Sequence, residues 1–175
     1  MKVENPGVHM DHMLKQTRSH HVQLSFMADS KASMLMTMAS VILTLSASYI
    51  TKPQFKWAAI SLMVFCLITI FLAVYAAMPK LPFSIKKKSF KDLDSPFFNL
   101  LFFGDFIRMS FEEYEESMEN VLNDPNMTYQ VQLKELYNLG LFLANKKYRF
   151  LKMAYIAFII GLLVSGSMLF FQILL

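Results

Sequence analysis

Three long apolar runs constrain this chain more than any other feature of its sequence. They cover Ser33–Ile50, Trp57–Met78 and Met153–Leu175, and none contains a charged residue. An α-helix needs roughly 17–25 apolar residues to cross a hydrocarbon core about 30 Å thick. Only 17% of the residues are charged, whereas soluble domains carry about 25%. The sequence therefore predicts an all-α membrane protein with three transmembrane helices, at residues 33–50, 57–78 and 153–175.

The positive charges predict how the chain is oriented. The short loop Thr51–Lys56 holds only Lys52 and Lys56 of the seventeen basic residues. All the others lie in the N-terminal segment or in Pro79–Lys152. Because basic residues accumulate on the cytoplasmic side, we expect a multi-pass membrane protein with a cytoplasmic N-terminus.

Long stretches without proline predict helices that continue beyond the membrane. Val8–Ile50 contains neither proline nor glycine, and Thr128–Leu175 contains no proline. We therefore expect an N-terminal cytoplasmic stalk helix over residues 1–32 and a cytoplasmic helical region over 79–152. In this interpretation, stalk helices extend from the first and third spans and form a helical cytoplasmic module.

Two further segments lie in the region 79–152. The Phe-rich segment Ser95–Asp105 is too apolar for a free linker and too short to span a bilayer. Apolar residues at a period of about 3.6 predict a helix over Phe106–Leu122. Asn123–Asn126 is typical of a turn, and Thr128 is the predicted N-cap of the helix that follows.

No catalytic motif is present in the sequence, which argues against an enzyme. Walker, dinucleotide-binding, nucleophile-elbow and zincin motifs are all missing. The four histidines, His9, His12, His20 and His21, lack the convergent ligand set that a metal site needs. We expect no metal site and no cofactor. The carboxylates of Glu112–Glu119 are interpreted as a solvated helix face.

A stripe of small polar residues runs along the first predicted span. Its serines and threonines are spaced by three or four residues, and an acidic residue lies one turn before the first of them. The stripe comprises Asp29, Ser33, Thr37, Ser40, Thr44 and Ser48. Such hydroxyls can bond across a helix–helix interface, or they can line a pore. Three spans cannot enclose a pore alone, so a pore requires an oligomer. For Asp29 the alternative to lining the pore is an interfacial ion pair with Lys31.

Basic residues beside the second and third spans offer contacts for anions. They form the groups Lys86–Lys88 and Lys146–Arg149, and the second group includes an aromatic residue, Tyr148. They could bind lipid headgroups or a nucleotide, or they could simply reflect the membrane orientation.

Three short motifs resemble those of the Pycsar effector transmembrane family, in the same order and spacing over about residues 20–170. They are Phe26-Met27-Ala28-Asp29-Ser30-Lys31-Ala32-Ser33, Asn99-Leu100-Leu101-Phe102-Phe103-Gly104-Asp105 with Ser110-Phe111-Glu112-Glu113-Tyr114, and Asn145-Lys146-Lys147-Tyr148-Arg149-Phe150-Leu151.

The resemblance implies a bacterial antiphage effector that impairs the inner membrane in response to a nucleotide. The signal would be a cyclic nucleotide or oligonucleotide made by a partner cyclase or nucleotidyltransferase. A separate cyclic-nucleotide-binding domain is missing from this sequence.

We expect a homo-oligomer in the lipid bilayer, with a tetramer favoured, acting as an ion channel or pore that causes abortive infection. Genomic nucleic acid is not an expected partner. The alternative is a non-conducting membrane anchor that recruits a cytoplasmic defence partner. The expected nucleotide-binding residues are Arg18, Arg108, Lys146, Lys147, Tyr148 and Arg149, and the expected pore-lining residues are those of the stripe.

Overall fold

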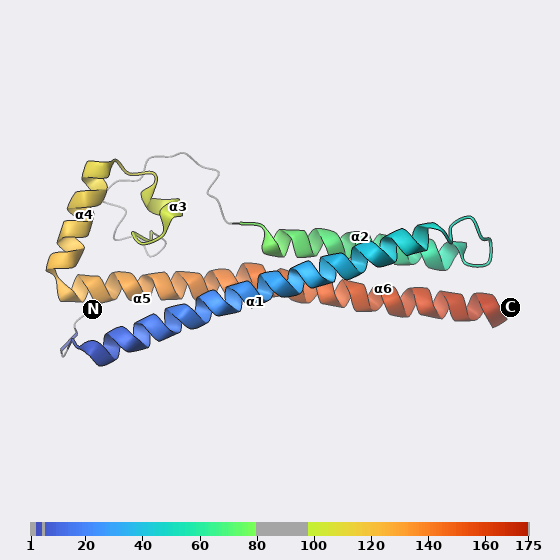
Figure 1. Ribbon diagram of the computed structural model, residues 1–175, viewed down its shortest axis with the longest axis horizontal. Coiled ribbons are helices and arrows are strands. Elements are labelled where there is room, and N and C mark those ends of the chain that lie inside the picture. Colours follow the sequence, from blue (N-terminus) through green and yellow to red (C-terminus); the bar gives the residue numbers. More distant parts are fainter. Residues whose placement is uncertain (1–2, 5, 80–97, 175) are drawn as a thin grey trace. The chain divides into compact units, whose positions relative to one another are not determined.

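The computed structural model describes residues 3–4, 6–79 and 98–174. Its helices, shown in Figure 1, are α1 (Val8–Ala47), α2 (Lys56–Ala77), α3 (Phe103–Phe106), α4 (Phe111–Asn123), α5 (Pro125–Phe142) and α6 (Arg149–Leu174). A π-helical segment, Leu143–Tyr148, joins α5 to α6. No strand occurs among the described residues, and three helices are long and apolar enough to cross a membrane. The predicted all-α class with three helices of spanning length is confirmed, and the cytoplasmic location of the stalk helices stays a prediction.

The chain divides into two compact units. The first unit comprises Met1–Gln23 and Pro79–Phe142, and the second, here called the spanning unit, comprises Leu24–Met78 and Leu143–Leu175. The basic group Lys86–Lys88 and the start of the Phe-rich segment lie outside the described residues.

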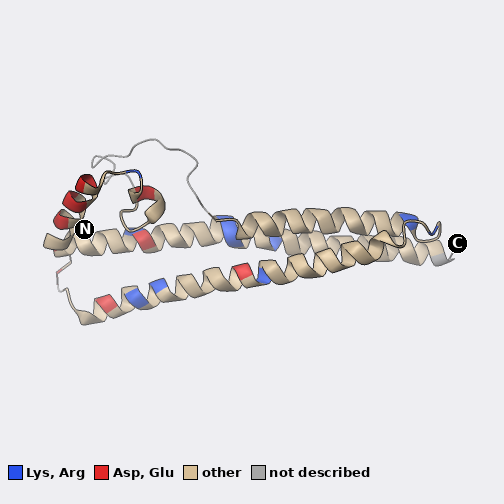
Figure 2. Cartoon of the chain, turned by 45° about the horizontal axis from the view of Figure 1, so that its top comes forward, with Lys and Arg blue, Asp and Glu red and all other residues tan. Residues whose placement is uncertain are grey.

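Small residues allow the helices of the spanning unit to pack closely. Its core contains Ala28, Ala32 and Leu35 of α1, alanines of α2, and Leu151 and Ala154 of α6. A Cβ atom added at Gly161 of α6 would collide with the Phe65 side chain of α2. Charges are sparse along α2 and α6, as Figure 2 shows. Most of the buried side chains described in the spanning unit are apolar.

In the first unit, part of the Phe-rich segment packs against α4. Phe98 and Leu100 are buried together with Val121 of α4. The Asn99 N–H donates to the Asp105 carboxylate over 3.1 Å, which fixes the turn that leads into α3. The described part of the segment, residues 98–105, is thus a packed part of the first unit and not a free linker.

The predicted start of α4 was wrong. The sequence pattern predicted a helix over Phe106–Leu122, but α4 begins at Phe111. Ser110 and Glu113 form a capping box, in which each side chain accepts a hydrogen bond from the other residue's backbone N–H. These two bonds satisfy N–H groups that would otherwise have no partner at a helix end, so the helix begins at this position.

Two other predicted boundaries also shift. Helix α5 begins at Pro125, three residues before the predicted cap at Thr128, because Asp124 accepts from the Asn126 N–H and proline is favoured in the first helical turn. Helix α1 ends at Ala47, three residues before the predicted Ile50. The long proline-free helices are otherwise present as predicted, apart from the π-helical segment.

Candidate functional site at the π-helical segment

A nearly buried lysine of the π-helical segment forms an ion pair with α1. Lys147 Nζ lies 2.6 Å from Asp29 Oδ2 and donates to Ser25 Oγ over 2.8 Å. The Lys147 side chain is 9% exposed, whereas that of Asp29 is 41% exposed. A buried ammonium is costly unless it is paired and hydrogen-bonded. Asp29 therefore supplies the counterion, and Ser25 a further hydrogen-bond acceptor, that the buried Lys147 ammonium needs.

Neighbouring residues of the same segment contact different helices. Lys146 donates to the Met78 carbonyl at the end of α2 over 3.1 Å, and its Nζ lies 5.5 Å from the centre of the Tyr75 ring. The Tyr148 hydroxyl donates to the Leu24 carbonyl of α1 over 3.2 Å. π-Helical turns widen the backbone and recur at functional sites. In this chain the segment links α1 and α2 to α6 through three consecutive side chains.

The polar stripe of α1 faces away from the other spans. Ser33, Thr37, Ser40, Thr44 and Ser48 are all exposed. The residues that α1 buries in the core are centred roughly 150° around the helix from them, at 100° per residue. The stripe therefore makes no helix–helix interface among the described residues of this chain.

The threonine hydroxyls of the stripe donate to their own helix. Thr37 donates to the Ser33 carbonyl and Thr44 to the Ser40 carbonyl, each over 3.0 Å. These bonds use the hydroxyl hydrogen and leave the oxygen able to accept from water or to contact a cation. The stripe can thus solvate an aqueous path without disrupting α1.

Asp29 lies between the stripe and the packed face of α1. It is paired with Lys147 and not with Lys31, because residues two apart on a helix do not face each other. Its other oxygen, Oδ1, is buried and has no hydrogen-bond partner among the described atoms. Asp29 therefore belongs both to the stripe and to the ion pair with Lys147.

The first unit contains a second ion pair. Arg18 of α1 lies 3.0 Å from Glu135 of α5; the arginine side chain is 58% exposed and the glutamate 14%. Burial raises the pKa of Glu135, and the Arg18 charge partly opposes that rise. Nearby, the Tyr129 hydroxyl donates to Asp11 over 2.9 Å, and this bond to a carboxylate raises the pKa of Tyr129.

The six predicted nucleotide-binding residues fall into two groups. Arg18 and the half-buried Arg108 belong to the first unit, and the other four belong to the spanning unit. Within the second group Arg149 is exposed, while Lys147 is bonded to Asp29. The contacts place each side chain but do not test its role in binding.

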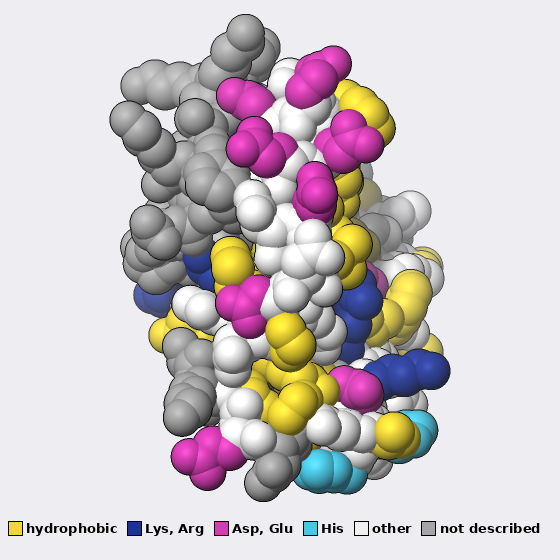
Figure 3. All heavy atoms as spheres, turned by 90° about the vertical axis from the view of Figure 1, so that its left-hand side faces the viewer, with side chains coloured by type: hydrophobic (Ala, Val, Ile, Leu, Met, Phe, Trp, Pro, Cys, Tyr) yellow, Lys and Arg dark blue, Asp and Glu magenta, His cyan; other side chains and the backbone are white. Residues whose placement is uncertain are grey.

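No group of three or more metal-binding side chains occurs in the part of the chain that the structure describes. The acidic side chains of α4 gather on its exposed surface (Figure 3), as expected for a solvated face. The lowered pKa of Glu112 comes first from a backbone hydrogen bond and then from Ser110, which agrees with the start of a helix.

Sequence reasoning missed Ser25 and Glu135 as partners of the basic residues. Ser25 precedes Asp29 by four residues, so the two share one face of α1, and this spacing was a usable signal. No local signal marks Glu135, because its partner Arg18 is distant in the sequence.

These features define a multi-pass α-helical membrane protein with polar and charged contacts beside its spans. The chain matches the Pycsar effector protein domain over residues 12–174 and belongs to that family. It is therefore an antiphage membrane effector controlled by a cyclic nucleotide that a partner cyclase makes. The family is one of membrane effectors and not of known enzymes. Searches of curated proteins and of solved structures gave no match.

Proposed function

We propose that the chain assembles into an oligomeric ion channel of the bacterial inner membrane, with the polar stripe of α1 lining the aqueous path. The exposure of Ser33, Thr37, Ser40, Thr44 and Ser48 on the face opposite the packed core carries this proposal. Several copies would have to contribute α1, because three helices cannot enclose a pore. Opening the path would dissipate the membrane potential and cause abortive infection.

The nucleotide signal would act through the basic residues beside the spans. We propose Lys146, Lys147 and Arg149 of the spanning unit as phosphate contacts, with Tyr148 as a stacking surface. For Arg18 and Arg108, which belong to the first unit, nucleotide binding stays a prediction. A phosphate at Lys147 would compete with Asp29 for the ammonium, since both are anionic acceptors. A ligand can shift a conformational equilibrium only by its differential affinity for the two states. Competition at Lys147 supplies such a difference.

Helix α1 supplies the connection between signal and pore. Asp29 and the stripe belong to one continuous helix, Val8–Ala47. Release of Asp29 from Lys147 would therefore change the packing of the helix that carries the pore-lining hydroxyls. In this proposal no ligand other than the nucleotide and no cofactor is needed.

Ion flux in liposomes tests the proposal. The purified protein is reconstituted, its stoichiometry is measured by native mass spectrometry, and flux is recorded against a panel of cyclic mononucleotides and short oligonucleotides. The variant Thr37→Leu with Thr44→Leu should lose flux and keep its stoichiometry. The matched control, Met34→Leu with Met38→Leu, changes exposed residues of α1 outside the stripe and should retain flux.

Loss of assembly in the stripe variant, or loss of flux in the control alone, would contradict the assignment of the stripe. A well-behaved oligomer without flux under any of the nucleotides would support the second candidate, a non-conducting anchor. The exposed carboxylates on α4 are the observation that favours that candidate, because they offer a charged docking surface for a cytoplasmic partner.

A further inference from the structure

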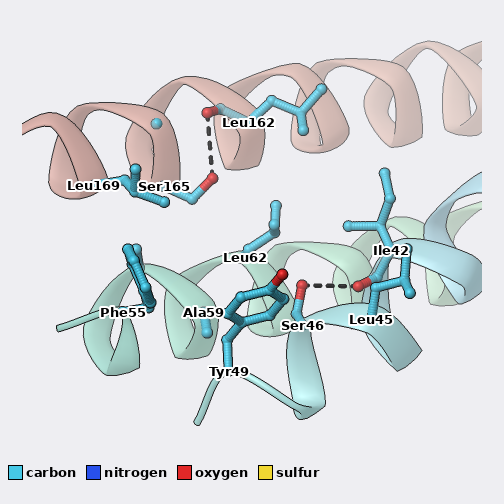
Figure 4. Close-up of a pocket in the computed structure, with 12 residues that line it drawn as sticks. Ile42, Leu45, Ser46, Tyr49, Phe55, Ala59, Leu62, Leu162, Ser165 and Leu169 are labelled. Carbon is cyan, nitrogen blue, oxygen red and sulfur yellow. Dashed lines mark hydrogen bonds between the residues drawn. The ribbon is translucent and has the colours of Figure 1, made fainter. Parts of the chain in front are cut away.

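A cavity of about 530 Å³ lies between the three helices of the spanning unit, near the turn that follows α1. Figure 4 shows residues of α1, α2 and α6 around it, including Leu45, Leu62 and Leu162. Its volume lies in the range of about 300–1,000 Å³ that small-molecule sites occupy. The cavity is separate from the ion pair of Lys147 and from the polar stripe.

The lining of this cavity suits a hydrocarbon chain. Apart from the Tyr49 ring, the polar side chains in it are Ser46 and Ser165. Their hydroxyls donate to the carbonyls of Ile42 and Leu162 of their own helices, over 2.7 and 3.2 Å. Because these donors are already used, the walls favour an apolar occupant over a polar one.

Two aromatic rings line the end of the cavity nearest the turn, and the turn also carries two lysines. The Tyr49 and Phe55 rings, which both line the cavity, meet edge to face with centroids 5.9 Å apart. Lys52 Nζ lies 5.1 Å from the Tyr49 ring centre, and Lys56 Nζ lies 5.9 Å from that of Trp57. Aromatic residues are enriched where a span meets the headgroups. The turn Thr51–Lys56 contains no acidic residue.

We propose that this cavity binds one acyl chain of an anionic phospholipid and that Lys52 binds its phosphate, with Lys56 adding positive charge. The hydrocarbon would lie among Leu45, Leu62 and Leu162, and the headgroup would lie at the turn. Charge complementarity favours a lipid over an apolar side chain of a second copy. This inference stands apart from the proposed channel, because it concerns neither the stripe nor the nucleotide.

Photolabelling in vesicles tests the proposal. The protein is reconstituted into phosphatidylcholine vesicles containing phosphatidylglycerol with a diazirine on its acyl chain, and labelled residues are mapped by peptide mass spectrometry. We expect label on cavity residues in excess of that on Phe71, an exposed residue of α2 outside the cavity. Lys52→Gln should weaken labelling by phosphatidylglycerol about fivefold, the effect of one basic residue near a membrane surface.

A variant that fills the cavity sharpens the test. Gly166 lines the cavity, and a Cβ atom added there meets no atom within 4 Å. Gly166→Leu should therefore fold normally and lose the cavity label while Phe71 keeps its label. The matched control Ser167→Leu adds similar bulk one residue later, outside this cavity, and should change neither.

Three results would overturn the proposal. They are equal labelling of the cavity and Phe71, cavity labelling that survives Gly166→Leu, and cross-links through the cavity to a second copy of the chain. Ion flux is measured on the same vesicles, so that a failure of the lipid proposal can be told apart from a failure of the channel proposal.

Discussion

The two units of this chain each contain an ion pair that includes a residue of α1, but burial falls on opposite charges. In the spanning unit the cation is buried, since Lys147 is 9% exposed and Asp29 is 41% exposed. In the first unit the anion is buried, since Glu135 is 14% exposed and Arg18 is 58% exposed. When the exposed partner is removed, a buried cation remains in the spanning unit and a buried carboxyl remains in the first unit.

Burial raises the pKa of the Glu135 carboxyl, so this group can become neutral by taking up a proton, whereas a buried ammonium that has lost its counterion is costly. Removing Asp29 therefore leaves an uncompensated charge, and removing Arg18 leaves a group that can neutralise. The Lys147 ammonium therefore depends more strongly on its counterion than the Glu135 carboxyl does. A contact that responds to a ligand needs this property.

The largest expected effect comes from Asp29→Asn. Removing the counterion of the buried Lys147 ammonium should cost about 3 kcal/mol, and thermal unfolding in detergent micelles should show that loss. The double variant Asp29→Asn with Lys147→Met should recover most of it, because the buried charge is gone. Lys31→Gln, at an exposed position on the same helix, is the control and should change little. A loss below about 1 kcal/mol would contradict the importance of the pair.

Close packing in the spanning unit predicts the next effect. Gly161→Ala places a Cβ atom against Phe65 and should cost about 2 kcal/mol, since overpacking forces the helices apart. Gly166→Ala on the same helix meets open space and should be neutral or slightly stabilising. Equal unfolding temperatures for the two variants would refute the close contact between α2 and α6.

In the first unit, helix capping should matter more than the ion pair. Ser110→Ala removes one bond of the capping box and should destabilise α4 by about 1 kcal/mol. Hydrogen exchange of the α4 amides measures this effect locally. The exposed Ser19, on α1 of the same unit, provides the control Ser19→Ala. Unchanged protection of the Glu113 amide would show that the cap contributes nothing.

The smallest effect is expected for Arg18→Gln, about 0.5 kcal/mol at neutral pH, because the pair has an exposed partner. Burial raises the pKa of Glu135 in the folded chain, so the folded state binds this proton more tightly. Stability should therefore increase as pH falls towards that raised pKa, and decrease as pH rises through it.

Removing Arg18 should raise the pKa of Glu135 further, so the destabilisation should be greatest near neutral pH and shrink under acid conditions. Unfolding of the wild type and of Arg18→Gln across this range measures the difference. A destabilisation by Arg18→Gln that grows as pH falls would contradict the predicted pH dependence.

The sequence predicted the helices of the spanning unit because lipid leaves few alternatives. A backbone within hydrocarbon must satisfy its own hydrogen bonds, so an uncharged apolar run of sufficient length becomes a helix. In the first unit, apolar periodicity continued through Ile107 and concealed the start of α4 at Phe111. The decisive signal was the spacing of Ser110 and Glu113, which is specific to a helix start.

The ion pair itself could not be predicted from local pattern. Asp29 and Lys147 were each singled out, but 118 positions separate them, and Lys31 was the nearer candidate in the sequence. The π-helical segment has no sequence signature comparable to a proline or a cap. The spacing of the polar stripe was visible in the sequence, but whether it packed within the chain required the structure.

The central claim is tested most directly by measuring whether the stripe is accessible to water while ions flow. Cys66 is the chain's one cysteine, so Thr37→Cys and Thr44→Cys are made in a Cys66→Ala background, with Met38→Cys as the control outside the stripe. Nucleotide-responsive flux in liposomes is recorded before and after a charged, membrane-impermeant thiol reagent. The account predicts that flux through both stripe variants is blocked while the Met38→Cys variant conducts unchanged. Block at Met38→Cys without block at Thr37→Cys or Thr44→Cys would contradict it.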